Sequence, residues 1–224
     1  MLRVGLTGDL GSGKSTVARM LGLRGAVVFS SDEMGRELMK PGNKVYDDIA
    51  GRFGKSVITA DGSLSRNELS KLAFAQGRVE ELNEIVHPAV IAEQQRRIEA
   101  LAKTQPHAIT VVESALIFVT KEGEGDKPWR KRFDRIVLVT APETLKIARF
   151  IQRIAAGREM DMGERAALEV DARNRLALQS TSERYAGECT VLRNDSFMAD
   201  LERRVEELWQ ELKAEEAKAA PPTA

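Results

Sequence analysis

The sequence has few of the residues that build disulfides, metal centres or membrane spans. It contains one cysteine, Cys189, so no disulfide forms within the chain. Its two histidines, His87 and His107, do not combine with that cysteine at a spacing typical of zinc ligands. No apolar run approaches the length needed to cross a membrane, and the first residues lack the basic and apolar regions of a secretory leader. These absences predict a cytoplasmic protein.

Neither sign of charge is in excess, because 34 Lys and Arg residues balance 34 Asp and Glu residues. Binding to a nucleic acid backbone is driven by excess basic charge, so nucleic acid is not an expected partner. With 42% hydrophobic residues, the chain is expected to be a soluble globular protein. We therefore expect small molecules as partners, with no membrane and no obligate protein partner.

Short apolar runs alternate with helical patterns, as in α/β proteins. Five runs are predicted to be strands: 2–6, 26–29, 108–112, 135–139 and 190–192. Helical patterns occupy most of the remainder, at 15–23, 33–39, 45–53, 66–75, 79–86, 89–102, from Pro142 onward, 164–178 and 197–212. This order predicts a three-layer α/β fold, with a mostly parallel five-stranded sheet flanked by helices and carrying a helical insertion.

The turn after the first strand carries the most specific signal. Gly8–Ser15, GDLGSGKS, fits the P-loop pattern G-x-x-x-x-G-K-[ST] in full. Such a match arises by chance about once in a hundred chains of this length, and here it also follows a strand and opens a helix. In this pattern backbone N–H groups face phosphate oxygens, Lys14 reaches the β- and γ-phosphates, and the Ser15 hydroxyl binds Mg²⁺. We predict a P-loop NTPase fold that uses ATP and Mg²⁺ and binds the nucleotide through Gly11, Ser12, Gly13, Lys14, Ser15 and Thr16.

Other features favour a small-molecule kinase among the P-loop proteins. A GTPase would need Asn-Lys-x-Asp to read its base, but the nearest match, 43–46, ends in tyrosine. A mechanical ATPase usually ends an apolar strand in paired acids, whereas 111–114 offers Glu113 alone. The small size, the helical insertion and a late segment that carries arginines all agree with a kinase.

Further segments carry a pattern that belongs to one kinase family. They are Ser31–Leu38 with Pro41-Gly42, Asp61–Arg66 leading to Leu72–Phe74, Leu82–Pro88, Leu116–Phe118, Arg149–Arg153 and Arg175–Gln179. With the P-loop, they make the chain resemble the dephospho-CoA kinase family from its first strand to about Ser196. The run Leu82–Pro88, together with the Asp32 segment and Arg66, is the most specific part. The resemblance implies ATP-dependent phosphorylation of the ribose 3′-hydroxyl of dephospho-CoA, the last step of coenzyme A biosynthesis.

Two carboxylates follow predicted strands at the edge where open α/β sheets bind ligands. Asp32 suits either a group that accepts the proton of the attacking hydroxyl or the N-cap of the next helix, and the resemblance implies the catalytic role. Glu113 suits either a magnesium ligand beside Ser15 or an acid in a surface turn. Lys14 and Asp32 are thus the candidate catalytic residues.

A helix after Pro142 carries Lys146, Arg149 and Arg153 on one face, at i, i+3 and i+7. Basic stripes of this kind are usually solvated. The resemblance instead implies a lid within about 149–179 that brings Arg149, Arg153 and Arg175 to the transferred phosphoryl group. It also implies that Arg66 and His87 belong to a CoA-binding helical region, although His87 equally suits the start of a helix.

The domain organisation expected from these patterns is a nucleotide-binding core of 1–43 and 106–215, a helical substrate-binding region at 44–105, and a disordered tail at 216–224. Three positions depart from the family pattern. Asp9 stands where a second glycine is common, Ser30 replaces the first acid of Asp-x-Asp, and Glu113 replaces an aspartate. We expect Asp9 to point to solvent. Two alternatives stay open: a kinase of another specificity, which would differ in the 44–105 region, and a nucleotide-binding regulatory protein without turnover, which only these three departures support.

Overall fold

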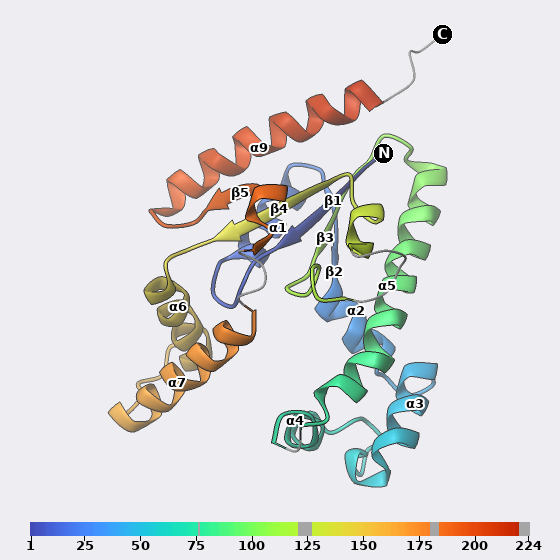
Figure 1. Cartoon of the computed structure of the whole chain (residues 1–224), viewed down its shortest axis with the longest axis vertical. Coiled ribbons are helices and arrows are strands. Elements are labelled where there is room, and N and C mark those ends of the chain that lie inside the picture. Colours follow the sequence, from blue (N-terminus) through green and yellow to red (C-terminus); the bar gives the residue numbers. More distant parts are fainter. Residues whose placement is uncertain (76, 121–126, 180–183, 220–224) are drawn as a thin grey trace. The chain divides into compact units, whose positions relative to one another are not determined.

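The computed structural model describes residues 1–75, 77–120, 127–179 and 184–219. Five strands in this part of the chain form one sheet in the order β2-β3-β1-β4-β5 (Figure 1). β1 pairs in parallel with β3 and with β4, and β4 pairs in parallel with β5. The predicted α/β class with a parallel five-stranded sheet is confirmed. The strands are β1 Leu2–Thr7, β2 Val27–Ser30, β3 Ile109–Glu113, β4 Arg135–Thr140 and β5 Thr190–Arg193.

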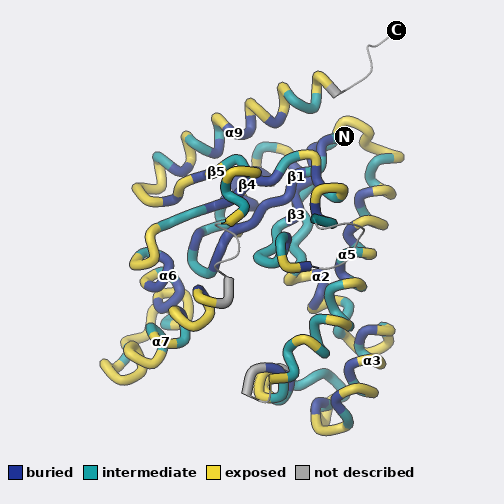
Figure 2. The backbone as a smooth tube through the Cα atoms, viewed as in Figure 1, coloured by how far each residue is buried: buried dark blue, intermediate teal, exposed yellow. Residues whose placement is uncertain are grey.

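Helices α1 (Lys14–Leu23) and α9 (Met198–Ala219) cover the sheet face that bears Val4 and Leu6. Figure 2 shows β1 buried along its length, while α9 is exposed on its outer side. Within the helical pattern predicted at 197–212, the apolar residues Leu201, Val205, Leu208 and Leu212 are buried, but Phe197 precedes the helix and is 84% exposed. On the other face Ile117 and Phe133 approach Gly5 so closely that a Cβ there would lie 3.0 Å from each side chain.

The chain forms two compact units, one of Met1–Phe29 with Leu101–Ala224 and the other of Ser30–Ala100. The second unit is helical, with α2 (Ser31–Leu38), α3 (Lys44–Phe53), α4 (Arg66–Ser70) and most of α5 (Val79–Thr104). Its core is Val45, Ile49, Phe53, Val57 and Leu69, and Leu38 packs against it. Because α2 packs on this core, the helical unit begins at Ser30 rather than at the predicted boundary of 44.

The prediction of two helices on either side of Pro88 is wrong, because α5 continues through this proline. Proline has no N–H and crowds the carbonyl four residues earlier, at a cost of about 3 kcal/mol. Packing on both sides offsets that cost, since Ile85 packs on the helical core and Val90 is buried. His87 therefore lies inside a helix rather than at its start.

Two further helices, α6 (Glu143–Ala155) and α7 (Met162–Gln179), follow β4. The prediction of a disordered tail at 216–224 is wrong for 216–219, because α9 continues to Ala219, and 220–224 lie outside the described residues. Ion pairs hold the last turns of α9, with 3.1 Å between Arg135 Nη1 and Glu215 Oε2 and 3.6 Å between the N-terminal nitrogen and Glu216 Oε1. Within the described ranges, no helix is both long and apolar enough to span a membrane.

Candidate active site

The loop that follows β1 starts between two neighbouring strand ends. Leu6 pairs with Glu113 of β3, and Thr7 pairs with Leu138 of β4. The loop therefore emerges at the carboxyl edge of the sheet, where α/β proteins bind their ligands. At its far end α1 begins after Gly13, which supplies no side-chain cap. The N–H groups of the first turn of a helix lack intrahelical acceptors, so they are available to an anion such as phosphate.

Two glycines let the loop lie directly against its neighbours. Gly11 has φ +71°, and a Cβ there would lie 2.2 Å from the backbone oxygen of Lys146 in α6. Gly13 has φ +95°, and a Cβ there would lie 2.2 Å from Nδ2 of Asn194, which follows β5. Both the left-handed backbone and the close approach require glycine. The P-loop backbone is thus packed against α6 and Asn194.

The predicted magnesium ligands lie together. Ser15 Oγ donates a hydrogen bond to Glu113 Oε1 at 2.5 Å. Hydroxyl and carboxylate oxygens suit Mg²⁺, which usually takes one or two protein ligands and completes its shell with phosphates and water. The described residues contain no group of three or more Asp, Glu, His or Cys side chains that could hold a metal ion, so phosphates and water would have to supply the other ligands. Lys14 is half-buried and has no hydrogen-bond or ion-pair partner in the part of the chain that the structure describes.

The expectation that Asp9 points to solvent is wrong. Its side chain is buried, and Oδ2 accepts a hydrogen bond from Lys146 Nζ at 2.8 Å. Burial of a carboxylate is tolerable when a cation compensates its charge, and α6 supplies that cation. Lys146 thus faces the P-loop, although its place in a basic stripe suggested solvent. Both residues were visible in the sequence, but nothing local indicated that they pair.

Arg149 and Asn194 complete the support of the loop. Arg149 donates from Nη1 to the backbone oxygen of Gly11 at 3.4 Å, and from Nη2 to Asn194 O and Oδ1 at 3.1 and 3.2 Å. Asn194 Nδ2 in turn donates to the backbone oxygen of Ser12 at 2.8 Å. Sequence reasoning missed Asn194, whose only signal was a polar side chain directly after the last strand.

The other two predicted lid arginines make contacts away from the P-loop. The guanidinium groups of Arg153 and Arg175 lie 5.7 and 5.6 Å from the centre of the Phe150 ring. Arg175 also forms an ion pair with Asp171, at 2.9 Å between Nε and Oδ1. Of the three arginines, Arg149 is therefore the one that contacts the phosphate loop.

In the helical unit, Ser30 rather than Asp32 caps α2. Ser30 Oγ accepts the N–H of Glu33 at 3.4 Å, in the geometry of an N-cap. Asp32 lies in the first turn and is exposed. The N-cap alternative for Asp32 is thus excluded, which leaves its carboxylate available for other chemistry. Arg66 is the first residue of α4, and its side chain lies outside those described.

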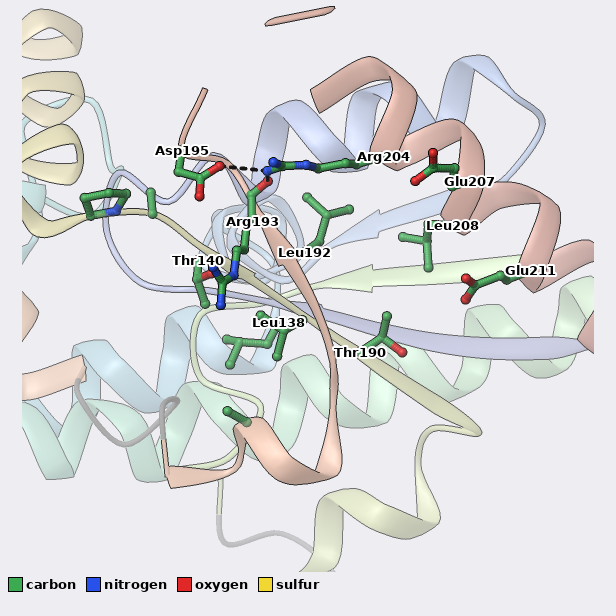
Figure 3. Close-up of a pocket in the computed structure, with 14 residues that line it drawn as sticks. Leu138, Thr140, Thr190, Leu192, Arg193, Asp195, Arg204, Glu207, Leu208 and Glu211 are labelled. Carbon is green, nitrogen blue, oxygen red and sulfur yellow. Dashed lines mark hydrogen bonds and ion pairs between the residues drawn. The ribbon is translucent and has the colours of Figure 1, made fainter. Parts of the chain in front are cut away.

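A hollow of about 850 Å³ lies beside β5 and is lined by residues from the ends of β4 and β5 and from α9 (Figure 3). Arg204 closes one side, where it donates to the backbone oxygen of Arg193 at 2.5 Å and to Asp195 Oδ1 at 2.8 Å. No P-loop residue lines this hollow. It is distinct from the phosphate-binding loop.

Comparisons with known proteins agree with the geometry. A family model described as dephospho-CoA kinase matches residues 2–200. The dephospho-CoA kinase of Thermobifida fusca is 33% identical over 214 residues, which covers 95% of this chain and 96% of that protein. The dephospho-CoA kinase of Methylococcus capsulatus is 36% identical over 211 residues, which covers 93% of this chain and 95% of that protein. Among solved structures, a Thermus thermophilus protein aligns with a TM-score of 0.67 at 26% identity, over 94% of this chain and 97% of that one.

Proposed function

The chain belongs to the dephospho-CoA kinase family, and from that premise we propose how its residues carry out the reaction. The reaction is a phosphoryl transfer from ATP to the ribose 3′-hydroxyl of dephospho-CoA, which gives CoA and ADP. The observation that carries the assignment is the family match over residues 2–200, which includes an intact P-loop on β1 and α1. The alternatives of another acceptor or of lost turnover are set aside on this ground.

ATP binds along the loop between β1 and α1 in this proposal. The backbone N–H groups of Gly11, Gly13, Lys14 and Ser15 hold phosphate oxygens, and the Lys14 ammonium spans the β- and γ-phosphates. The N–H groups of Ser12 and Thr16 instead donate to the backbone oxygens of Asp9 and Gly13, at 3.1 and 3.0 Å. The absence of a partner for Lys14 among the described residues supports this role. Phosphoryl transfer mostly requires positioning and charge neutralisation, so Lys14 counts as catalytic.

Ser15 and Glu113 hold Mg²⁺ in the proposed site. Their oxygens lie 2.5 Å apart at the carboxyl edge of the sheet, which supports a shared ligand role. A bound Mg²⁺ would neutralise charge on the β- and γ-phosphates. Glutamate at 113 provides the same charge as the more common aspartate with a longer reach.

Asp32 accepts the proton of the attacking 3′-hydroxyl in this proposal. It lies two residues beyond the end of β2, and its carboxylate is exposed and is not used as a helix cap. General bases of this kind contribute about 10²- to 10⁴-fold to rates.

The helical region at 44–105 binds dephospho-CoA in this proposal, with Arg66 among its contacts, while 149–179 acts as a lid that carries Arg153 and Arg175. Lids of this kind close when both substrates bind. Arg149 is fixed to the P-loop, so the moving part would begin beyond it. Hydrogen exchange with and without a bisubstrate analogue tests the lid, and amide protection across 153–179 should rise when the analogue binds. Unchanged protection would mean that Arg153 and Arg175 belong to a solvent-exposed helix face and not to a lid.

An acceptor panel tests the proposed function. ADP release is measured with dephospho-CoA, AMP, UMP and pantothenate, each with ATP and Mg²⁺. We expect dephospho-CoA to be turned over fastest, in a cytoplasmic enzyme without nucleic acid or membrane partners. Faster turnover of a nucleoside monophosphate would contradict the assignment of the acceptor.

A further inference from the structure

Asp9 and Lys146 are the only two charged residues that are buried in the part of the chain that the structure describes. They are 7% and 6% exposed, and 2.8 Å separates Asp9 Oδ2 from Lys146 Nζ. Asp9 belongs to the P-loop and Lys146 to α6, 137 positions later. The pair therefore joins the phosphate loop to a helix that is distant in the sequence.

Stability alone does not account for this pair. Removing two charges from water costs several kcal/mol per ion, and well-packed apolar residues often serve as well or better. The environment is also not arranged to satisfy the carboxylate, because Asp9 Oδ1 has no hydrogen-bond partner among the described atoms. Two other hydrogen bonds already hold the loop, one from Arg149 to the oxygen of Gly11 and one from Asn194 to the oxygen of Ser12. Rigidity of the loop therefore does not require a buried ion pair as well.

The charge of Asp9 is the feature that needs an explanation, because its loop is the one that binds polyphosphate. A carboxylate in a water-poor setting repels phosphates more strongly than it would in water. Lys146 supplies a compensating positive charge at hydrogen-bond distance. One turn later on the same helix, Arg149 donates a hydrogen bond to the backbone oxygen of Gly11. Helix α6 therefore both holds the loop backbone in place and compensates the negative charge of Asp9.

We propose that Lys146 is a positioning residue of the nucleotide site, which cancels the charge of Asp9 and so allows a P-loop with an acid at its second position to bind ATP. The proposal rests on the assignment of the P-loop as the ATP site. In this proposal Lys146 offsets the repulsion between the buried Asp9 carboxylate and the phosphates of ATP.

The two single variants should change ATP affinity in opposite directions. Lys146→Met leaves a buried negative charge in the loop, so MgATP should bind about tenfold more weakly, which is about 1.4 kcal/mol. Asp9→Asn removes that charge, so MgATP should bind at least as tightly as in the wild type, even if the variant melts at a lower temperature. A purely structural pair predicts instead that both variants weaken binding in step with their loss of stability.

The experiment measures dissociation constants of MgATP and adenosine by calorimetry, beside melting temperatures. Adenosine carries no phosphate, so Lys146→Met should change its affinity less than twofold. Lys146→Arg keeps the positive charge, and the double variant Asp9→Asn/Lys146→Met removes both charges, so both should bind MgATP with a dissociation constant within threefold of the wild type. The control variant Lys213→Met removes an exposed lysine of α9 and should bind MgATP as the wild type does.

Two results would overturn the proposal. One is weaker MgATP binding by Asp9→Asn, which decides the matter even if Lys146→Met fails to fold. The other is an equal loss of MgATP and adenosine affinity in Lys146→Met. Lys14→Ala separates this proposal from the ATP assignment, because unchanged MgATP affinity in that variant would instead show that the P-loop is not the nucleotide site.

Discussion

Asp32→Asn removes one negative charge and the ability to accept a proton, and it keeps the shape of the side chain. Asp32 occupies the first turn of α2, where a negative charge contributes about 0.3 to 1 kcal/mol through the helix dipole. Since Ser30 provides the cap, the loss of stability should stay below about 1 kcal/mol. That corresponds to a fall of under about 4 °C in Tm for a chain of this size.

Activity should fall far more than stability. Loss of a general base lowers rates by about 10²- to 10⁴-fold, or roughly 3 to 5 kcal/mol of barrier. Phosphoryl transfer passes through a loose transition state, so the base acts partly by orienting the hydroxyl. We therefore set a low threshold for the catalytic role: kcat for Asp32→Asn should fall more than about threefold, which corresponds to a barrier increase of more than about 0.7 kcal/mol.

Ser30→Ala is the matched control. It removes the oxygen that accepts the Glu33 N–H, so it should cost about 1 kcal/mol of stability and leave kcat near that of the wild type. Steady-state ADP release and thermal melting are measured on both variants. A kcat for Asp32→Asn within about threefold of the wild type, or an equal fall in kcat for Ser30→Ala, would refute the catalytic role of Asp32.

Three further substitutions test the phosphate loop. Lys14→Ala should lower kcat at least about a hundredfold without unfolding the protein, because the ammonium is not part of the core; near-normal turnover of the folded variant would refute its role. Glu113→Gln should raise the Mg²⁺ concentration needed for half-maximal activity about tenfold, since a neutral amide is a weaker ligand; an unchanged Mg²⁺ titration would exclude it as a ligand. Gly11→Ala should destabilise the protein by about 2 kcal/mol or more, because its Cβ would lie 2.2 Å from the oxygen of Lys146. Gly51→Ala has open space in α3 and should raise Tm slightly; similar shifts for both glycines would contradict the packing argument.

Contiguous motifs made the phosphate site predictable. Eight adjacent residues between a strand and a helix specify the P-loop, and the pairing of Ser15 with Glu113 follows because parallel strands end at one edge of the sheet. Apolar periodicity likewise located all five strands. These features depend on neighbours in the sequence or on the general rules of parallel sheets, so the sequence pattern was enough to predict them.

Features that depend on tertiary packing were not predictable in this way. The Asp9–Lys146 pair joins residues 137 positions apart, and it exists because α6 packs directly against Gly11. Pro88 signals a helix end by local rules, but packing on both sides keeps α5 continuous. Ser30 shows an intermediate case. It replaces the first acid of the family pattern, and the spacing Ser30-x-x-Glu33 carries the sequence signature of an N-cap.

Identification of the product tests the central claim most directly. The purified protein is incubated with dephospho-CoA, Mg²⁺ and ATP labelled at the γ-phosphate, and the position of the label is determined by mass spectrometry and ³¹P NMR. The account predicts CoA, with one labelled phosphoryl group on the ribose 3′-oxygen, and no such product with Lys14→Ala. A label on another oxygen, or label released only as inorganic phosphate, would contradict it.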